Sequence, residues 1–141
     1  MYEPSRPKSV VQRVDAHRAD TASYPHSSRG EALDIQLAGH LAALLAVTDE
    51  LGLDDDGAVR IAAQVTRLRG SHPVRVAYPA LADGADARTL HRRARDLAAR
   101  ALLVAASRAD TAAAILAAQR MDAHTAALEA PDRAGAQAGA H

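Results

Sequence analysis

Apolar residues recur at three- and four-residue steps in the first half of the chain, the pattern of a helix with one buried face. This pattern predicts a helix over 31–51. The stripe consists of leucines: Leu33, Leu37, Leu41, Leu44, Leu45 and Leu51. Ser28 and Glu31 have the spacing of a capping box, and Gly52 followed by Leu53 is typical of a helix C-terminus. We expect this helix to lie at the centre of the core.

A second, shorter helix is predicted over 56–69. Its apolar positions repeat at helical steps: Ile61, Val65 and Leu68. Three arginines are expected on the outer face of this helix: Arg60, Arg67 and Arg69. Gly70 is expected to end it. The preceding aspartates, 54–56, resemble a metal site, but acidic residues also cap helix starts and oppose the helix dipole. Because Arg60 stands where a calcium loop needs an acidic ligand, we interpret the aspartates as caps that bind no metal.

The next stretch, 71–81, does not fit a helical pattern. Three larger side chains alternate with smaller or polar ones between two prolines: Val74, Val76 and Tyr78. This alternation favours extended backbone, and no partner strand is evident elsewhere in the chain. We therefore expect an extended crossover that these three side chains pin to the bundle. Asp83 or Asp86 is then available to cap the next helix.

No glycine or proline interrupts residues 85–128, in which alanine, leucine and arginine dominate. We expect one continuous helix, with a kink near Ser107 as the alternative because Ser107 and Asp110 have cap-like spacing. A continuous helix would be about 65 Å long, roughly twice the length of the 31–51 helix, so its far part would lack neighbours. That part is predicted to mediate self-association through its larger apolar residues: Ile115, Leu116, Met121 and Leu128.

These elements predict an all-α fold, an irregular helical bundle with a long alanine-rich C-terminal helix and an extended, proline-bounded crossover. At 141 residues the chain is about the size of one domain. We expect a single helical domain over 9–130. Prolines and mixed charges predict disorder in 1–8, and small, polar and glycine residues predict a disordered tail over 131–141.

Composition excludes several kinds of chemistry. The chain has no cysteine, so disulfides, thiolate catalysis and cysteine zinc sites are excluded. No two histidines have the three- or four-residue spacing of a helical metal site, and no serine elbow or glycine-rich phosphate loop is present. We therefore expect no catalytic residue, metal or cofactor. The alanine and arginine bias is typical of a high-GC bacterial genome. With no signal-like or membrane-spanning apolar run, we expect a cytoplasmic protein.

These observations favour a small interaction or regulatory protein that acts through helix surfaces, as a homodimer or with another protein. The alternative is a regulator that binds nucleic acid. Its candidate phosphate contacts lie on adjoining turns: Arg88, Arg92 and Arg95. Two observations argue against nucleic-acid binding. The net charge of the chain is zero, and the arginines of this helix are also explained by an exposed ladder of ion pairs at four-residue steps: Arg92, Asp96 and Arg100. A third hypothesis, a helical enzyme or ligand-binding bundle, would need a closed polar pocket around His40 or His91.

Overall fold

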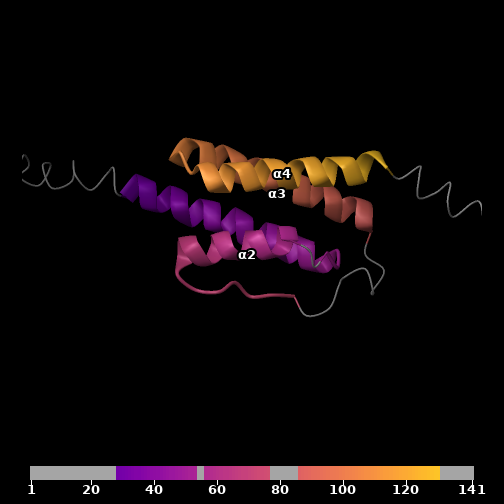
Figure 1. Cartoon of the computed structure of the whole chain (residues 1–141), viewed down its shortest axis with the longest axis horizontal. Helices are drawn as coiled ribbons and strands as arrows, with labels where there is room; N and C mark the ends of the chain where they lie inside the picture. The colour runs from indigo at the N-terminus through magenta and orange to yellow at the C-terminus, as the bar shows by residue number, and fades with distance from the viewer. Residues whose placement is uncertain (1–27, 54–55, 77–85, 131–141) are drawn as a thin grey trace, which may run out of the picture. The chain divides into compact units, whose positions relative to one another are not determined.

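The computed structural model describes residues 28–53, 56–76 and 86–130. Of these residues 85% are helical and none lies in a strand, so the all-α prediction is confirmed. The described helices are Ser28–Glu50, α2 (Asp56–Arg69), α3 (Ala87–Arg108) and α4 (Thr111–Glu129) (Figure 1).

The chain divides into two compact units, Met1–Ala32 and Leu33–His141, and only residues 28–32 of the first are described. The termini that we expect to be disordered, 1–8 and 131–141, lie outside the described residues. The single domain over 9–130 stays a prediction.

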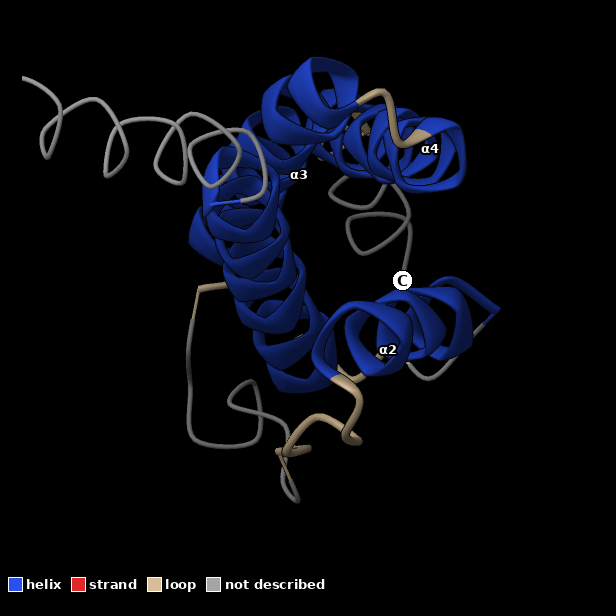
Figure 2. Cartoon of the chain, turned by 90° about the vertical axis from the view of Figure 1, so that its left-hand side faces the viewer, coloured by secondary structure: helices blue, strands red, loops and turns tan. Residues whose placement is uncertain are grey.

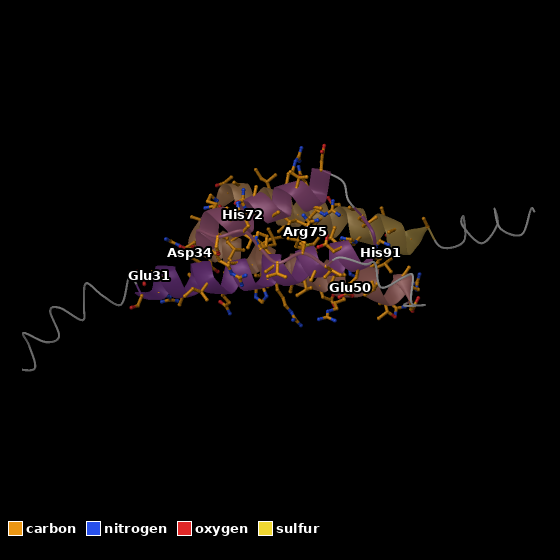
Figure 3. The ribbon with its side chains drawn as sticks, turned by 90° about the horizontal axis from the view of Figure 1, so that it is seen from below. Glu31, Asp34, Glu50, His72, Arg75 and His91 are labelled. Carbon is orange, nitrogen blue, oxygen red and sulfur yellow. The ribbon has the colours of Figure 1, made fainter. Side chains whose placement is uncertain are left out.

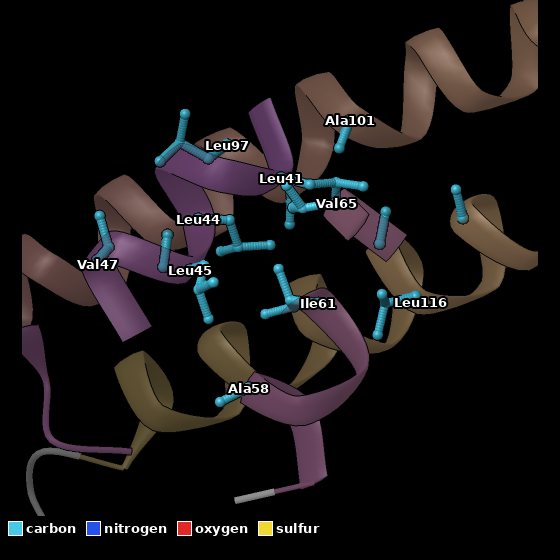
Figure 4. Close-up of a cluster of buried hydrophobic side chains, with 14 of the residues drawn as sticks. Leu41, Leu44, Leu45, Val47, Ala58, Ile61, Val65, Leu97, Ala101 and Leu116 are labelled. Atoms are coloured by element: carbon cyan, nitrogen blue, oxygen red, sulfur yellow. The ribbon is translucent and has the colours of Figure 1, made fainter. Parts of the chain in front are cut away.

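The leucine stripe of the Ser28–Glu50 helix forms the centre of the core, as its spacing predicted. Leu37, Leu41, Leu44 and Leu45 are fully buried. Figure 4 shows the last three in one cluster with residues of every other described helix. Those neighbours are Ala58, Ile61 and Val65 of α2, Leu97 and Ala101 of α3, and Leu116 of α4. Side chains at i, i+4 and i+7 lie on one helix face, so this single stripe contacts three neighbouring helices.

The C-terminus of this helix has the predicted glycine cap. Gly52 has a φ of 75°, a left-handed conformation that glycine adopts without a steric penalty. The N–H of Leu53 donates to the carbonyl of Thr48 at 3.0 Å, and the N–H of Gly52 donates to that of Asp49 at 2.9 Å. These two bonds define a Schellman motif. At the other end, Ser28 is already helical and the described residues show no capping-box hydrogen bond from it, so that prediction was wrong.

Helix α2 follows its predicted register. Ile61 and Val65 are fully buried, and Gly70 ends the helix with a φ of 77°. The three arginines expected outside are exposed: Arg60, Arg67 and Arg69. Asp56 is the first residue of the helix, where its charge opposes the helix dipole. Asp54 and Asp55 lie outside the described residues, so capping by them stays a prediction.

The described part of the crossover, 72–76, is neither helix nor strand, and the two valines that we expected to pin it to the bundle do not do so. Val74 is 93% exposed, and Val76 is exposed as well. Instead the guanidinium of Arg75, which is labelled in Figure 3, donates twice to the Asp49 carboxylate, at 2.7 and 2.9 Å. The N–H of Val76 donates to the same carboxylate at 3.0 Å. A two-pronged charged contact fixes this segment where an alternating apolar pattern had suggested burial. Tyr78 lies outside the described residues.

The long helix expected over 85–128 is two helices, so our preference for continuity was wrong. Ala109 separates α3 from α4 with a φ of 58° and a ψ of 35°. The N–H of Asp110 donates to the carbonyl of Ala105 at 2.8 Å, which closes a Schellman turn on an alanine. The Asp110 carboxylate then accepts from the N–H of Ala113 at 3.2 Å and caps α4. The break at Ala109 lies two residues past Ser107, close to the kink that the sequence offered as the alternative.

Helices α3 and α4 lie side by side as an antiparallel hairpin (Figure 1, Figure 2). Residues near the start of α3 contact residues near the end of α4: Arg88 reaches Leu128, and His91 reaches His124. Six buried residues of these two helices are alanines, named here the alanine seam: Ala94, Ala98, Ala101, Ala105, Ala113 and Ala117. Such small side chains allow two helix backbones to approach closely.

Candidate functional site

The four residues expected to mediate self-association occupy different environments. Leu116 and Leu128 are buried, and Met121 packs partly buried against the core. Ile115 points outward and is 54% exposed. The cause is the turn at Ala109, which folds α4 back onto its own bundle and provides the neighbours that a continuous helix would have lacked. Only Ile115 of this set is therefore placed to contact another molecule.

Ile115 borders a shallow groove at the α3–α4 turn, with a volume of about 390 Å³. The groove is lined mainly by methyl groups. Its walls come from both sides of the turn: Ala105, Ala106, Ala109, Asp110, Thr111, Ala114, Ile115 and Ala118. Because alanine fills little space beside the backbone, the two helices leave an apolar hollow that is open to solvent. The sequence predicted Ile115 as a contact residue, but it gave no sign of the hollow, which depends on the missed turn.

Asp110, at the edge of this groove, also ties the turn to α2. Its second carboxylate oxygen lies 2.6 Å from a guanidinium nitrogen of Arg67. Burial alone would raise the pKa of Asp110. The hydrogen bonds from Arg67 and the N–H of Ala113, with the positive charges of Arg67 and Arg108, outweigh burial and lower that pKa below its usual value. The carboxylate is therefore ionised at neutral pH, and it connects α2 with the first turn of α4.

The candidate phosphate contacts on α3 are partly engaged within the fold. Arg88 donates to the carbonyl of Leu128 at 3.1 Å, satisfying a C-terminal carbonyl of α4. Arg95 forms a long ion pair with Asp96 at 4.0 Å. Arg92 is exposed. The pKa of Asp86 is lowered mainly by the hydrogen bonds that its carboxylate accepts from Thr89 and from the N–H of Arg88, and the charge of Arg92 makes a smaller contribution. The ion pair of Asp96 is thus with Arg95, not with the ladder partners that we expected.

Two histidines that the sequence did not link meet across the hairpin. The Nδ1 atoms of His91 and His124 lie 2.9 Å apart, and the ring centroids 5.1 Å apart. One ring nitrogen must donate and the other accept, so the accepting Nδ1 carries no proton. Burial lowers the pKa of His91 below its usual 6.5. The pair lies 33 residues apart in sequence, so a search for histidines on one helix face misses it.

These contacts bear on the metal and enzyme hypotheses. In the described part of the chain, no group of three or more histidine or acidic side chains lies close enough to hold a metal ion. Near His40, burial and the charge of Arg100 lower the pKa of the imidazole, which favours its neutral form. His40 and His91, the residues that we proposed for a closed polar pocket, lie outside the lining of the groove at the turn.

The Ser28–Glu50 helix is long and apolar enough to cross a membrane by length and composition alone. We had expected no such segment. The core helix of a soluble protein passes the same test, and the leucine stripe of this helix is buried against its neighbours. Cytoplasmic localisation therefore stays a prediction. No known protein family, curated protein or solved structure matches this chain, so its candidate site is defined by its own residues.

Proposed function

We propose that this chain is a small helical interaction protein that pairs with a second copy of itself through the groove at the α3–α4 turn. The observation that carries the proposal is that the exposed side chain of Ile115 borders an alanine-lined groove on the same surface. A two-fold interface uses the same patch on both subunits, so a patch must be complementary to itself. Ile115 of each copy can enter the groove of the other.

The energetics favour a weak dimer. Burying an exposed isoleucine stabilises a complex by about 1.5–3 kcal/mol, and a symmetric pair buries two. Stable interfaces usually bury at least about 1,000 Å², so the contact must extend from the groove over neighbouring surface of α3 and α4. The alanines around the groove permit such a contact, because their small side chains allow helices of the two copies to approach closely. The expected dissociation constant is about 1–100 µM, because one apolar knob per subunit has to offset the entropy of association.

Light scattering and sedimentation on the intact chain, from about 1 to 200 µM, test the dimer across the expected range of affinity. The variant Ile115→Glu should remain folded and become monomeric, because its charge would have to enter an apolar groove. Leu116→Glu is not a useful companion, since Leu116 is buried and its loss would damage the core. The matched control is Ile35→Glu, the same change at an exposed isoleucine of another helix.

A monomeric mass for the intact chain at the highest concentration would refute the dimer. A dimer that survives Ile115→Glu, or one that Ile35→Glu disrupts equally, would refute the proposed interface at the groove.

Nucleic-acid binding is the second candidate, supported by three exposed arginines of α3: Arg92, Arg93 and Arg100. Phosphate contacts release counterions, so binding to a DNA duplex should weaken steeply between about 50 and 200 mM salt. Fluorescence anisotropy with a labelled duplex measures this dependence. Loss of binding in Arg93→Gln, with Ile115→Glu binding normally, would favour this function over self-association.

A further inference from the structure

Arg120, in the middle of α4, is a buried cation without a counter-ion in the described part of the chain. Its side chain and backbone together are only 9% exposed, and its Nε atom is buried without a hydrogen-bond acceptor. No hydrogen bond or ion pair joins it to the residues that the structure describes. Burying a charge without a partner is costly, and a guanidinium that keeps its proton cannot escape the cost by becoming neutral. An anion in its vicinity would offset that cost.

Arg120 lines a cavity of about 600 Å³ between α2 and α4. Each helix contributes three residues at helical spacing, so both walls are single faces of rigid elements. The lining residues are Asp56, Gly57 and Arg60 of α2 and Leu116, Gln119 and Arg120 of α4. None of them lines the groove at the α3–α4 turn. This cavity is thus a separate candidate site.

The charges in this cavity favour an anion. Arg60 supplies a second guanidinium, whose Nη1 lies 3.4 Å from the Oε1 atom of Gln119, so a residue of the opposite wall helps to orient it. The cavity also adjoins the first turn of the 14-residue α2, the positive end of its dipole. Asp56 is the one acidic residue of the lining, and it forms no ion pair with Arg60 or Arg120. Two positive charges and one negative charge leave the cavity with a net positive charge.

We propose that this cavity binds a phosphate group, with Arg120 as the buried donor and Arg60 as the donor at the rim. A guanidinium matches two oxygens of phosphate with two parallel N–H donors, and a pair of arginines suits a doubly charged group better than a carboxylate. Gln119 can add a neutral donor, because its amide nitrogen stays available while its oxygen accepts from Arg60. The group is either inorganic phosphate or the phosphate of a small monoester.

Isothermal titration calorimetry at pH 8 and constant ionic strength tests this site with inorganic phosphate and glycerol phosphate. At this pH both probes are largely dianions. We expect a dissociation constant of about 1 mM or lower for at least one probe, and at least tenfold weaker binding of acetate. Tighter binding of glycerol phosphate would identify a monoester as the ligand, and equal binding would identify the phosphate group alone. Either result supports the site.

Variants of the lining distinguish this site from general charge attraction. Arg120→Met, which keeps the side-chain length, and Arg60→Gln should each weaken phosphate binding at least tenfold. Asp56→Asn should strengthen it severalfold, since the change removes the one repelling charge. The control is Arg69→Gln, an equal change in charge on an exposed residue of α2 outside the cavity, which should bind as the unmodified chain does.

Three results would overturn the proposal: no phosphate binding at 20 mM, acetate binding equal to that of phosphate, or the same loss in Arg69→Gln as in Arg60→Gln. If Arg120→Met does not fold, Arg60→Gln and Asp56→Asn still test whether the cavity binds phosphate. Both residues are exposed, so their substitution leaves the core intact. Their opposite expected effects on affinity cannot come from a change in stability alone.

Discussion

Replacing Asp110 should reveal how much one carboxylate contributes to the α3–α4 turn. Its Oδ1 atom caps α4 by accepting from Ala113, and its Oδ2 atom pairs with Arg67. Alanine removes both contacts, whereas asparagine keeps a good capping oxygen and loses only the charge. Comparing Asp110→Ala with Asp110→Asn therefore separates the cap from the ion pair.

The magnitudes follow from the exposure of the two partners. Loss of an N-cap costs about 1 kcal/mol. The side chain of Asp110 is 11% exposed but that of Arg67 is 48% exposed, so solvent screens the pair and its share is about 0.5 kcal/mol. We expect Asp110→Ala to cost about 1.5 kcal/mol and Asp110→Asn about 0.5 kcal/mol. For a chain of this size the larger value corresponds to a fall of about 4–5 °C in Tm.

Urea unfolding followed by circular dichroism at pH 7 measures both costs. Asp122→Ala and Asp122→Asn, at an exposed aspartate of α4, control for the change in net charge. Because the pKa of Asp110 is lowered in the folded state, its contribution is full above the unfolded value of 3.8 and is lost as the pH falls through the folded value. Equal costs for alanine and asparagine would refute the capping role. No cost for either would show that Asp110 does not stabilise the turn.

Three further predictions concern other parts of the molecule. Leu44→Ala should lower the free energy of unfolding by about 2–5 kcal/mol in urea titrations, since the side chain is fully buried in the core; an unchanged midpoint would contradict its central position. Ala109→Gly should raise the Tm, with a gain of up to about 1 kcal/mol, because glycine adopts the left-handed φ of 58° without strain; a lower Tm would argue against this turn. Burial holds the folded pKa of His91 below its usual 6.5, so the unfolded chain binds more protons and stability should fall as the pH drops below about 6.5. His91→Asn should reduce that slope in unfolding measured from pH 8 to 5, and an unchanged slope would show that His91 is not responsible.

The sequence predicted those features whose causes lie within one or two helical turns. The leucine stripe has only one face to bury, and Gly52 followed by Leu53 specifies a helix end without reference to the rest of the chain. The same holds for the inward face of α2 and for Asp86, whose carboxylate accepts from the N–H of Arg88 and caps α3.

The features that the sequence did not predict depend on partners far along the chain. At the α3–α4 turn, alanine occupies a position where glycine is the usual signal, and the Arg67–Asp110 pair spans 43 residues. The crossover is anchored by Asp49, 26 residues away from Arg75. Periodicity within one helix carries no information about such pairs, because it reports which face is apolar and not which helix lies opposite. The buried position of Arg120 was missed for the same reason.

The alanine seam of α3 and α4 has a consequence for the substitutions that each part of the core tolerates. Leucines such as Leu41 can be replaced by side chains of similar volume, because neighbouring rotamers can adjust. An alanine has no rotamer and loses no side-chain entropy on packing, so the seam is ordered at little entropic cost. It also has no freedom with which to absorb an added methyl group. Ala98 and Ala101 are fully buried, so any larger residue at either position must displace its neighbours. The leucine stripe is therefore sensitive to loss of volume and the seam to gain of volume, and variation among related chains should follow that division.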